Sequence, residues 1–270
     1  MANGNGLTES ILRRDRALLV ALIGLLFVLA GLYTVYGLGM GMTALEMTAM
    51  RGMKDMPGAS APGAWSVGYA LLVFLMWWVM MIAMMLPSVA PTVLLYAALL
   101  RRGANAGAVP AISGAFLGGY LVTWAGFSVL AATAQWALEA LGLVSATMMT
   151  LIDTVPGAIV LIAAGLFQFT SLKRSCLNHC RSPAEFLTSR RRPGMAGAFV
   201  MGLEHGVFCL GCCWFLMALL FVGGIMNLYW IVALTAFVAL EKLTPFGETA
   251  GKIAGAALTA WGSFILFGAL

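Results

Sequence analysis

The side chains best suited to chemistry lie in one otherwise apolar segment, residues 194–222. Steps of four, four and three residues place them on one stripe of an α-helix: Met201, His205, Cys209 and Cys212, with Cys213 beside them. Thiols, an imidazole and a thioether cost free energy in hydrocarbon, so a spanning helix tends to retain them where something compensates that cost. A soft metal ion would do so, because thiolate and thioether sulfur select ions such as Cu(I).

A second set precedes this segment, in the polar stretch 172–194. Cys176, His179 and Cys180 form the pattern C-x2-H-C, which places two thiols and an imidazole within about one helical turn. All five Cys and both His of the chain fall between 176 and 213. A single Cys is often only a small buried hydrophobe, but this clustering favours metal binding for the set as a whole.

Two alternatives concern individual residues of these sets. Cys209 and Cys212 form C-x2-C, the spacing of thiol–disulfide exchangers. Cys213 and His205 have no role in that chemistry, whereas both are natural metal ligands. Glu204 lies about three turns into the apolar segment, and we expect it to pair with the imidazole, as a second-shell group of a metal site, or with an arginine.

Methionines are concentrated in the segment 38–64. They follow the first apolar run and begin with Met40 and Met42. Four more have strict three-residue spacing: Met47, Met50, Met53 and Met56. Thioethers suit Cu(I) and are poor ligands for hard ions, so the segment is a candidate for capturing that ion. The alternative is an amphipathic interfacial helix that uses Met as its apolar face.

The next apolar run carries a methionine stripe at 76, 80 and 84. Such a stripe is more often packing than an ion path, but Met80 and Met84 remain candidates for guiding a metal. Pro87 and Pro91 follow, and we expect them to break the helix, which is tolerated where protein or a cavity satisfies the freed backbone groups.

The composition is that of a membrane protein. Of the 270 residues, 62% are hydrophobic and only 9% are charged, against about 25% charged in soluble globular domains. Runs near the roughly 20 residues that a spanning helix needs occur at 17–37, 66–86 (continuing toward 100), 108–138, 155–171, 195–222, 228–241 and 253–270. The sequence therefore predicts an all-α, polytopic transmembrane bundle of about seven spans, or six if 228–270 folds as one re-entrant unit.

The basic residues predict the orientation. With the N-terminus in the cytoplasm, 13 of the 15 Lys and Arg lie on the inner side, and only Arg51 and Lys54 lie outside. We expect a disordered cytoplasmic tail at 1–16 and a single transmembrane domain at 17–270, with a Met-rich outer loop at 38–64 and a Cys/His inner loop at 172–194. Glu241 and Lys242 are expected to reach water at the inner interface. Because the basic residues lie in short clusters between apolar runs, nucleic-acid binding is not indicated.

Glycine spacing predicts where helices pack closely. Gly114, Gly118 and Gly119 form one such group, and Gly202 and Gly206 form another. Small residues at this spacing let two helix backbones approach in a membrane.

Three long motifs resemble a bacterial family known as predicted metal-binding integral membrane proteins. They are MWWVMMIAMMLPSVAPTVLLYAALLRR (76–102), QFTSLKRSCLNHCRSP (168–183) and GLEHGVFCLGCCWFLMALLFVGGIMNLYW (202–230), followed by EK at 241–242. The resemblance covers most of 65–245 and implies a membrane location and metal binding through seven residues: Cys176, His179, Cys180, His205, Cys209, Cys212 and Cys213. That family has no established activity.

These observations favour an integral protein of the bacterial inner membrane that handles Cu(I), by uptake, transfer or delivery to a membrane enzyme, with zinc or another soft metal as the alternative ion. Its expected partners are the lipid bilayer, the metal ion, and a metallochaperone or membrane enzyme. Two other functions remain open: an intramembrane thiol–disulfide oxidoreductase that uses Cys209 and Cys212, and an assembly or structural subunit of a larger membrane complex.

Overall fold

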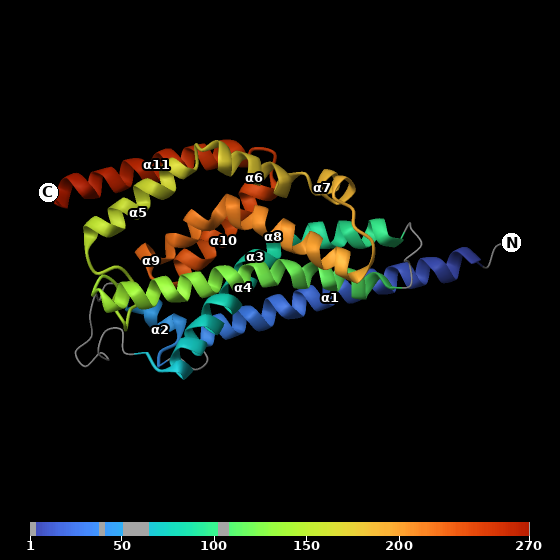
Figure 1. Cartoon of the computed structure of the whole chain (residues 1–270), viewed down its shortest axis with the longest axis horizontal. Coiled ribbons are helices and arrows are strands. Elements are labelled where there is room, and N and C mark those ends of the chain that lie inside the picture. The colour runs from blue at the N-terminus through green and yellow to red at the C-terminus, as the bar shows by residue number, and fades with distance from the viewer. Residues whose placement is uncertain (1–3, 38–40, 51–64, 102–107, 270) are drawn as a thin grey trace.

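The chain folds almost entirely into α-helices. The computed structural model describes residues 4–37, 41–50, 65–101 and 108–269, and in these ranges it contains no β-strand, only one isolated antiparallel bridge between Val144 and Leu151 (Figure 1). The prediction of an all-α fold is confirmed.

Five helical stretches are long and apolar enough to cross a membrane. They belong to α1 (Gly4–Tyr36), α3 (Val67–Arg101), α4 (Val109–Ala140), α8 (Gly194–Ala218) with the short α9 (Leu220–Gly223), and α11 (Gly247–Ala269). The pair α5 (Thr154–Phe167) and α6 (Ser171–Arg181), which is bent by 64°, adds a sixth if it is counted as one broken span. The polytopic bundle is thus confirmed, with five or six spans by length and composition.

The difference from about seven spans arises at α10 (Leu228–Leu243). This helix has 16 residues, or about 24 Å at 1.5 Å per residue, which is shorter than a hydrocarbon core of about 30 Å. Its direction nevertheless alternates with those of its neighbours in sequence, α8 and α11, in the ribbon view (Figure 1).

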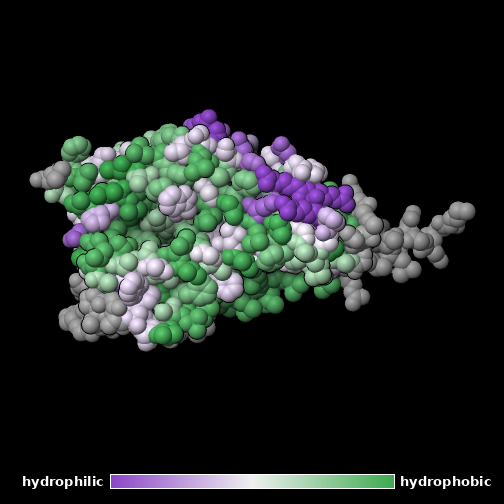
Figure 2. Space-filling model, viewed as in Figure 1, coloured by the Kyte–Doolittle hydropathy of each residue, from purple (hydrophilic) through white to green (hydrophobic). Residues whose placement is uncertain are grey.

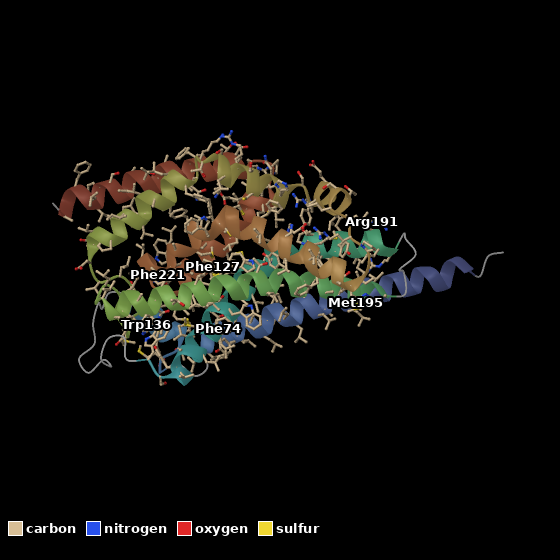
Figure 3. The ribbon with its side chains drawn as sticks, in the orientation of Figure 1. Phe74, Phe127, Trp136, Arg191, Met195 and Phe221 are labelled. Carbon is tan, nitrogen blue, oxygen red and sulfur yellow. The ribbon has the colours of Figure 1, made fainter. Side chains whose placement is uncertain are left out.

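The lateral surface of the bundle is apolar. Side chains such as Phe264 and Phe267 are 78% and 79% exposed, which a soluble protein seldom allows over so wide an area. Hydrophilic residues gather instead over the end that holds α6 and α7 (Pro183–Ser189) (Figure 2). Arg191 and Met195 lie at this same end, whereas Trp136 and Phe221 lie toward the other (Figure 3).

Helix α1 begins at Gly4, ahead of the apolar span that starts at Arg16. One local expectation, which concerns α3, is corrected. Helix α3 runs unbroken through Pro87 and Pro91, and the hydroxyl of Ser88 donates to the carbonyl of Met85 at 2.9 Å within this stretch. The prolines therefore do not divide the helix.

Glycines set the contact between α4 and α8. A Cβ atom on Gly202 would lie 1.9 Å from the carbonyl oxygen of Phe116, and one on Gly119 would lie 2.0 Å from that of Phe199. Both backbones are thus too close for any side chain at these positions, as the glycine spacing predicted. Gly114 and Gly118, by contrast, face open space. Through this contact α4 and α8 hold one another in register.

The described part of the Met-rich segment contains the short helix α2 (Ala44–Ala49). Thr43 begins it with a capping box, in which its backbone N–H donates to Glu46 at 2.8 Å. This hydrogen bond, together with that from the Thr43 hydroxyl, keeps the pKa of Glu46 below its usual value. Met47 on this helix is buried in the hydrophobic core, so its sulfur is not available at the surface.

Candidate metal centre

The stripe on α8 points into the protein. Its members are all buried, with 3% of His205 exposed and less of the others: Met201, Cys209, Cys212 and Cys213. The thioether sulfur of Met201 is engaged at one end of the stripe, where it accepts from the backbone N–H of Arg192 at 3.3 Å. The expected grouping of donors on one helical face is present.

Helix α6 brings the second set to the first. Residues 171–181 form a helix rather than a loop, capped by Thr170, and it packs against α8. The thiol of Cys180 is buried and interacts with the thiols of both Cys209 and Cys212. Cys176 is half-buried, and its sulfur lies 2.6 Å from where a Cβ on Gly211 would stand. The two Cys sets therefore adjoin one another across the α6–α8 contact.

Lys242 is one of two residues, with Glu241, that the sequence interpretation wrongly placed at the interface with water. Its ammonium donates to the sulfur of Cys209 at 2.8 Å, and the side chain is buried instead of reaching water. The hydroxyl of Tyr120 on α4 lies 3.0 Å from the same sulfur. An adjacent ammonium supplies the counter-charge that a buried thiolate requires. The one available signal was the charged pair at 241–242, which closes an apolar segment; nothing in the sequence pointed to Tyr120.

The other two thiols on α8 make different contacts from that of Cys209. Cys212 and Cys213 donate to the carbonyl oxygen of Cys209 at 3.0 and 2.9 Å. Hydrogen bonds of this kind return to the preceding turn of the same helix. Cys209 thus faces the cation while its neighbours are held as donors.

The two histidines occupy different environments. His205 lies among the rings of Phe116, Tyr120 and Phe186, with the Phe186 centroid 5.1 Å away. Its Nδ1 atom is buried and has no hydrogen-bond partner among the described residues, so a donor atom is left for a ligand. His179 stacks on Phe208, and its Nδ1 lies 2.8 Å from the carbonyl oxygen of Ser175.

Glu204 pairs with arginines and not with the neighbouring imidazole. Its carboxylate lies 2.5 Å from Arg192 and 3.6 Å from Arg190. Of the two pairings that the sequence allowed, the structure shows the one with arginine. It ties the start of α8 to the basic segment that precedes it.

A buried charged group lies beside the thiols, at the bend between α5 and α6. Lys173 donates to both carboxylate oxygens of Glu241 at 2.7 and 2.8 Å and also to Gln168. The side chain of Gln168 at the bend is therefore held in this buried group, whereas Phe169 and Thr170, which follow it, are exposed. Glu241, expected at the interface with water, is 1% exposed.

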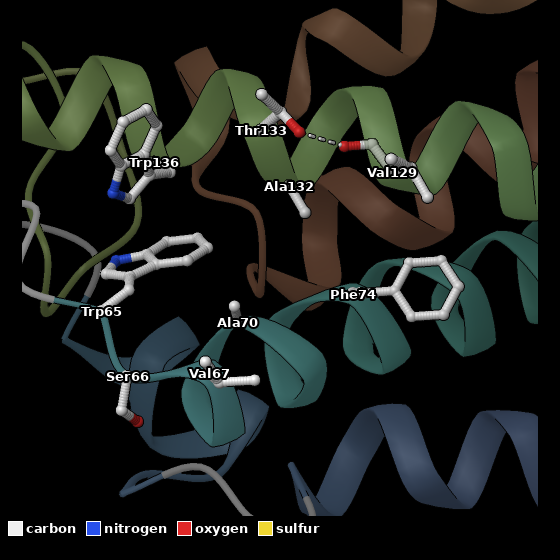
Figure 4. A pocket seen from close by; sticks show the side chains of 9 residues that line it. All are labelled: Trp65, Ser66, Val67, Ala70, Phe74, Val129, Ala132, Thr133 and Trp136. Carbon is white, nitrogen blue, oxygen red and sulfur yellow. Dashed lines mark hydrogen bonds between the residues drawn. The ribbon is translucent and has the colours of Figure 1, made fainter.

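The methionine candidates of residues 40–84 belong to other segments of the chain than the Cys and His residues of α6 and α8. Met80 and Met84 are buried in α3, Met42 packs against the core and Met50 is half-buried. Met40, Met53 and Met56 lie outside the described residues. The apolar cavity between the start of α3 and the end of α4, of about 370 Å³, is lined by residues such as Trp65 and Trp136 and by no Cys or His (Figure 4).

The donors do not form a closed multi-ligand site. Within residues 4–37, 41–50, 65–101 and 108–269, no three or more His, Cys, Asp or Glu side chains are arranged to hold a metal ion together. A structural zinc site needs four such ligands in a tetrahedron. Cu(I), which two thiolates bind in a linear arrangement, makes the smaller demand on this geometry.

Comparison with known proteins supplies the family. A family model described as copper chaperone, PpoB2, matches residues 74–265, which is more than half of the chain. The matched region contains all five Cys, both His and Lys242. No curated protein and no solved structure matches the chain. The chain therefore belongs to the PpoB2 copper chaperone family.

Proposed function

We propose that this protein is a membrane-embedded carrier of Cu(I), which it holds between the thiolates of α6 and α8 and passes to a partner protein. The observation that carries the proposal is the meeting of Cys180 with Cys209 and Cys212 in the buried core. A ligand pair drawn from two helices can bind an ion tightly and release it by a small movement of one helix.

The choice of copper rests on the donors and on the family. Every candidate ligand is a thiol, an imidazole or a thioether, and thioethers add affinity for Cu(I) but little for zinc. The membership in a copper chaperone family agrees with this choice. Ag(I), which has the same charge and softness, should bind in the same way.

The proposed route crosses the bundle from one end to the other. Helix α2 lies toward the end that holds the C-terminus, and α6 and α7 lie toward the opposite end (Figure 1). With the N-terminus in the cytoplasm of a bacterial inner membrane, Met42 and Met50 would capture copper outside and Met80 and Met84 would guide it. Cys176 and His179, at the edge of the centre, would pass it to a soluble metallochaperone or a membrane enzyme.

The test is Cu(I) loading of the purified protein under anaerobic conditions, with a competing chelator. We expect one tightly held Cu(I) per chain. The variants Cys180→Ser, Cys209→Ser and Cys212→Ser should each lose at least about tenfold in affinity, the lower end of what outer-shell changes alone can cost. Cys176→Ser is the matched control and should keep the affinity, because its sulfur lies at the edge of the buried set. A wild-type protein that stays metal-free would refute the proposal.

A second function, thiol–disulfide exchange, is favoured by the same Cys180–Cys209 contact but not by the C-x2-C pair. Cys209 and Cys212 lie in the middle of a continuous helix, where Cβ atoms three residues apart stand about 5–6 Å from one another. A disulfide needs about 3.5–4.5 Å. Trapping of a mixed disulfide with a partner would support this function over metal transfer. Purification with partners at fixed stoichiometry would instead favour an assembly subunit.

A further inference from the structure

We infer that Lys242 makes the centre selective for a monovalent ion, by supplying one positive charge that balances a metal bound to two thiolates. The inference rests on the proposed function and adds to it a residue that determines which ion is held. It comes from one contact, the hydrogen bond of 2.8 Å from the Lys242 ammonium to the sulfur of Cys209.

Lys242 forms no ion pair with a carboxylate in the described residues, and the nearby Glu241 is already paired with Lys173 at 2.7 Å. The pair of Lys173 and Glu241 carries no net charge. One buried positive charge therefore remains at the thiols, and only the thiolates and the metal that they hold can balance it.

The net charge of the loaded centre then differs between metal ions of similar softness. Two thiolates with Cu(I) or Ag(I) carry a net charge of minus one, and the ammonium brings the centre to zero. Two thiolates with Hg(II) are already neutral, so the ammonium leaves the centre at plus one. Because Hg(II) also accepts two thiolates in a line, the two ions differ here mainly in charge.

The geometry allows this role without blocking the site. Lys242 belongs to α10, while the thiols belong to α6 and α8, so the cation approaches Cys209 from a third helix. Tyr120 adds a hydroxyl from α4 at 3.0 Å. The sulfur of Cys209 can thus keep its hydrogen bonds to the protein while a metal is bound by its remaining lone pair.

The test compares Ag(I) and Hg(II) binding to the full-length protein in detergent, each by competition with a thiol chelator. In Lys242→Met we expect the affinity for Ag(I) to fall at least about tenfold, equivalent to 1.4 kcal/mol, while the affinity for Hg(II) is unchanged or higher. Lys242→Gln keeps a donor for Cys209 and should show the same change in the Ag(I)/Hg(II) ratio. Lys242→Arg keeps the charge and should keep the wild-type ratio.

The matched control is the double variant Lys173→Met with Glu241→Met, which removes a buried pair without net charge and should leave the ratio as it is. A parallel loss of both ions in Lys242→Met and Lys242→Gln would overturn the inference and assign Lys242 a structural role. Unchanged Ag(I) binding in both variants would overturn it as well. A wild-type protein that binds neither ion would instead overturn the proposed function, so the two failures are distinguishable.

Discussion

The imidazole of His179 lies flat on the ring of Phe208, with the ring centroids 4.1 Å apart and the planes at 1°. Phe208 directly precedes Cys209 on α8, so this stack joins the outer face of α6 to the thiol centre. A cavity of about 340 Å³ opens beside His179 and is bounded by Phe186, whose ring is also in contact with His205. One aromatic ring therefore separates the cavity from the buried imidazole, and under the proposed function this cavity would be the mouth through which the ion is exchanged.

The first prediction concerns His179. Replacing it by Phe keeps a ring on Phe208 but removes the nitrogen donors, whereas Ala removes both. If the imidazole takes part in transfer, both variants should slow the release of Cu(I) to a soluble chelator by about tenfold or more, within the range known for changes near a metal. The equilibrium affinity should stay at the wild-type value. Stopped-flow measurement of Cu(I) release checks this, and normal rates in His179→Phe would show that the ring serves only for packing.

The second prediction concerns the α4–α8 contact. In Gly202→Ala the new Cβ would lie 1.9 Å from the carbonyl oxygen of Phe116, and backbone cannot yield as a side chain can. We expect the helices to separate, with a loss of about 1–3 kcal/mol in the free energy of unfolding and weaker copper binding. Gly118→Ala is the matched control, since nothing lies within 4 Å of its added methyl group. Thermal unfolding in detergent measures both, and equal stability of the two variants would contradict the prediction.

The spacing of residues along the sequence predicted which side chains share a helical face, but it did not predict which side chains from other helices contact them. Periodicity alone places His205 and the three thiols of α8 on one face, because a helix repeats every 3.6 residues whatever its neighbours are. The long apolar runs and the low fraction of charged residues predicted a bundle of spanning helices, because a helix must be apolar along about 20 residues to cross a membrane. The position of Lys242 could not be obtained in this way, since snorkelling to water and pairing with a buried sulfur are both open to a lysine at the end of a helix. Only the packing of α10 against its neighbours decides between them.

The same limit applies to the bends. Pro87 and Pro91 predict a break in α3, yet the helix continues, because surrounding helices can satisfy the carbonyls that proline leaves free. The bend between α5 and α6 has no proline and occurs at Gln168 to Thr170. There Lys173 of α6 donates both to Gln168 and to Glu241 of α10. At this bend, a contact between residues far apart in the sequence accompanies a change of direction that no proline marks.

The third prediction concerns a polar network away from the thiols. The buried carboxylate of Glu139 accepts from Trp65 at 2.8 Å and from Gln135 at 2.9 Å, and Gln135 in turn accepts from Trp77 at 2.9 Å. In Glu139→Ala the buried amide of Gln135 and the half-buried indole of Trp65 lose their acceptor, so we expect a loss of about 1–3 kcal/mol in the free energy of unfolding. Copper affinity should not change.

Thr133→Val is the matched control on the same helix. It removes a hydroxyl that bonds only to its own helix, at 2.8 Å from the carbonyl oxygen of Val129, and such exposed changes are usually worth less than about 0.5 kcal/mol. Thermal unfolding measured by tryptophan fluorescence suits this comparison, because Trp65 and Trp77 belong to the network. A stable Glu139→Ala protein would mean that water enters and replaces the carboxylate.

The fourth prediction separates capture from packing among the methionines. Leucine at positions 47, 50, 53 and 56 together removes four thioethers and keeps their volume, at a cost below about 1.5 kcal/mol for each buried position. If exposed thioethers collect Cu(I), cells with this variant should accumulate less copper, while the purified protein keeps its Cu(I) affinity. Met47→Leu alone is the control: Met47 is buried in the core, so its sulfur is not available for capture and accumulation should be normal. Normal accumulation in the fourfold variant would leave these residues with packing and interfacial anchoring as their role, and would move the point of entry to another part of the bundle.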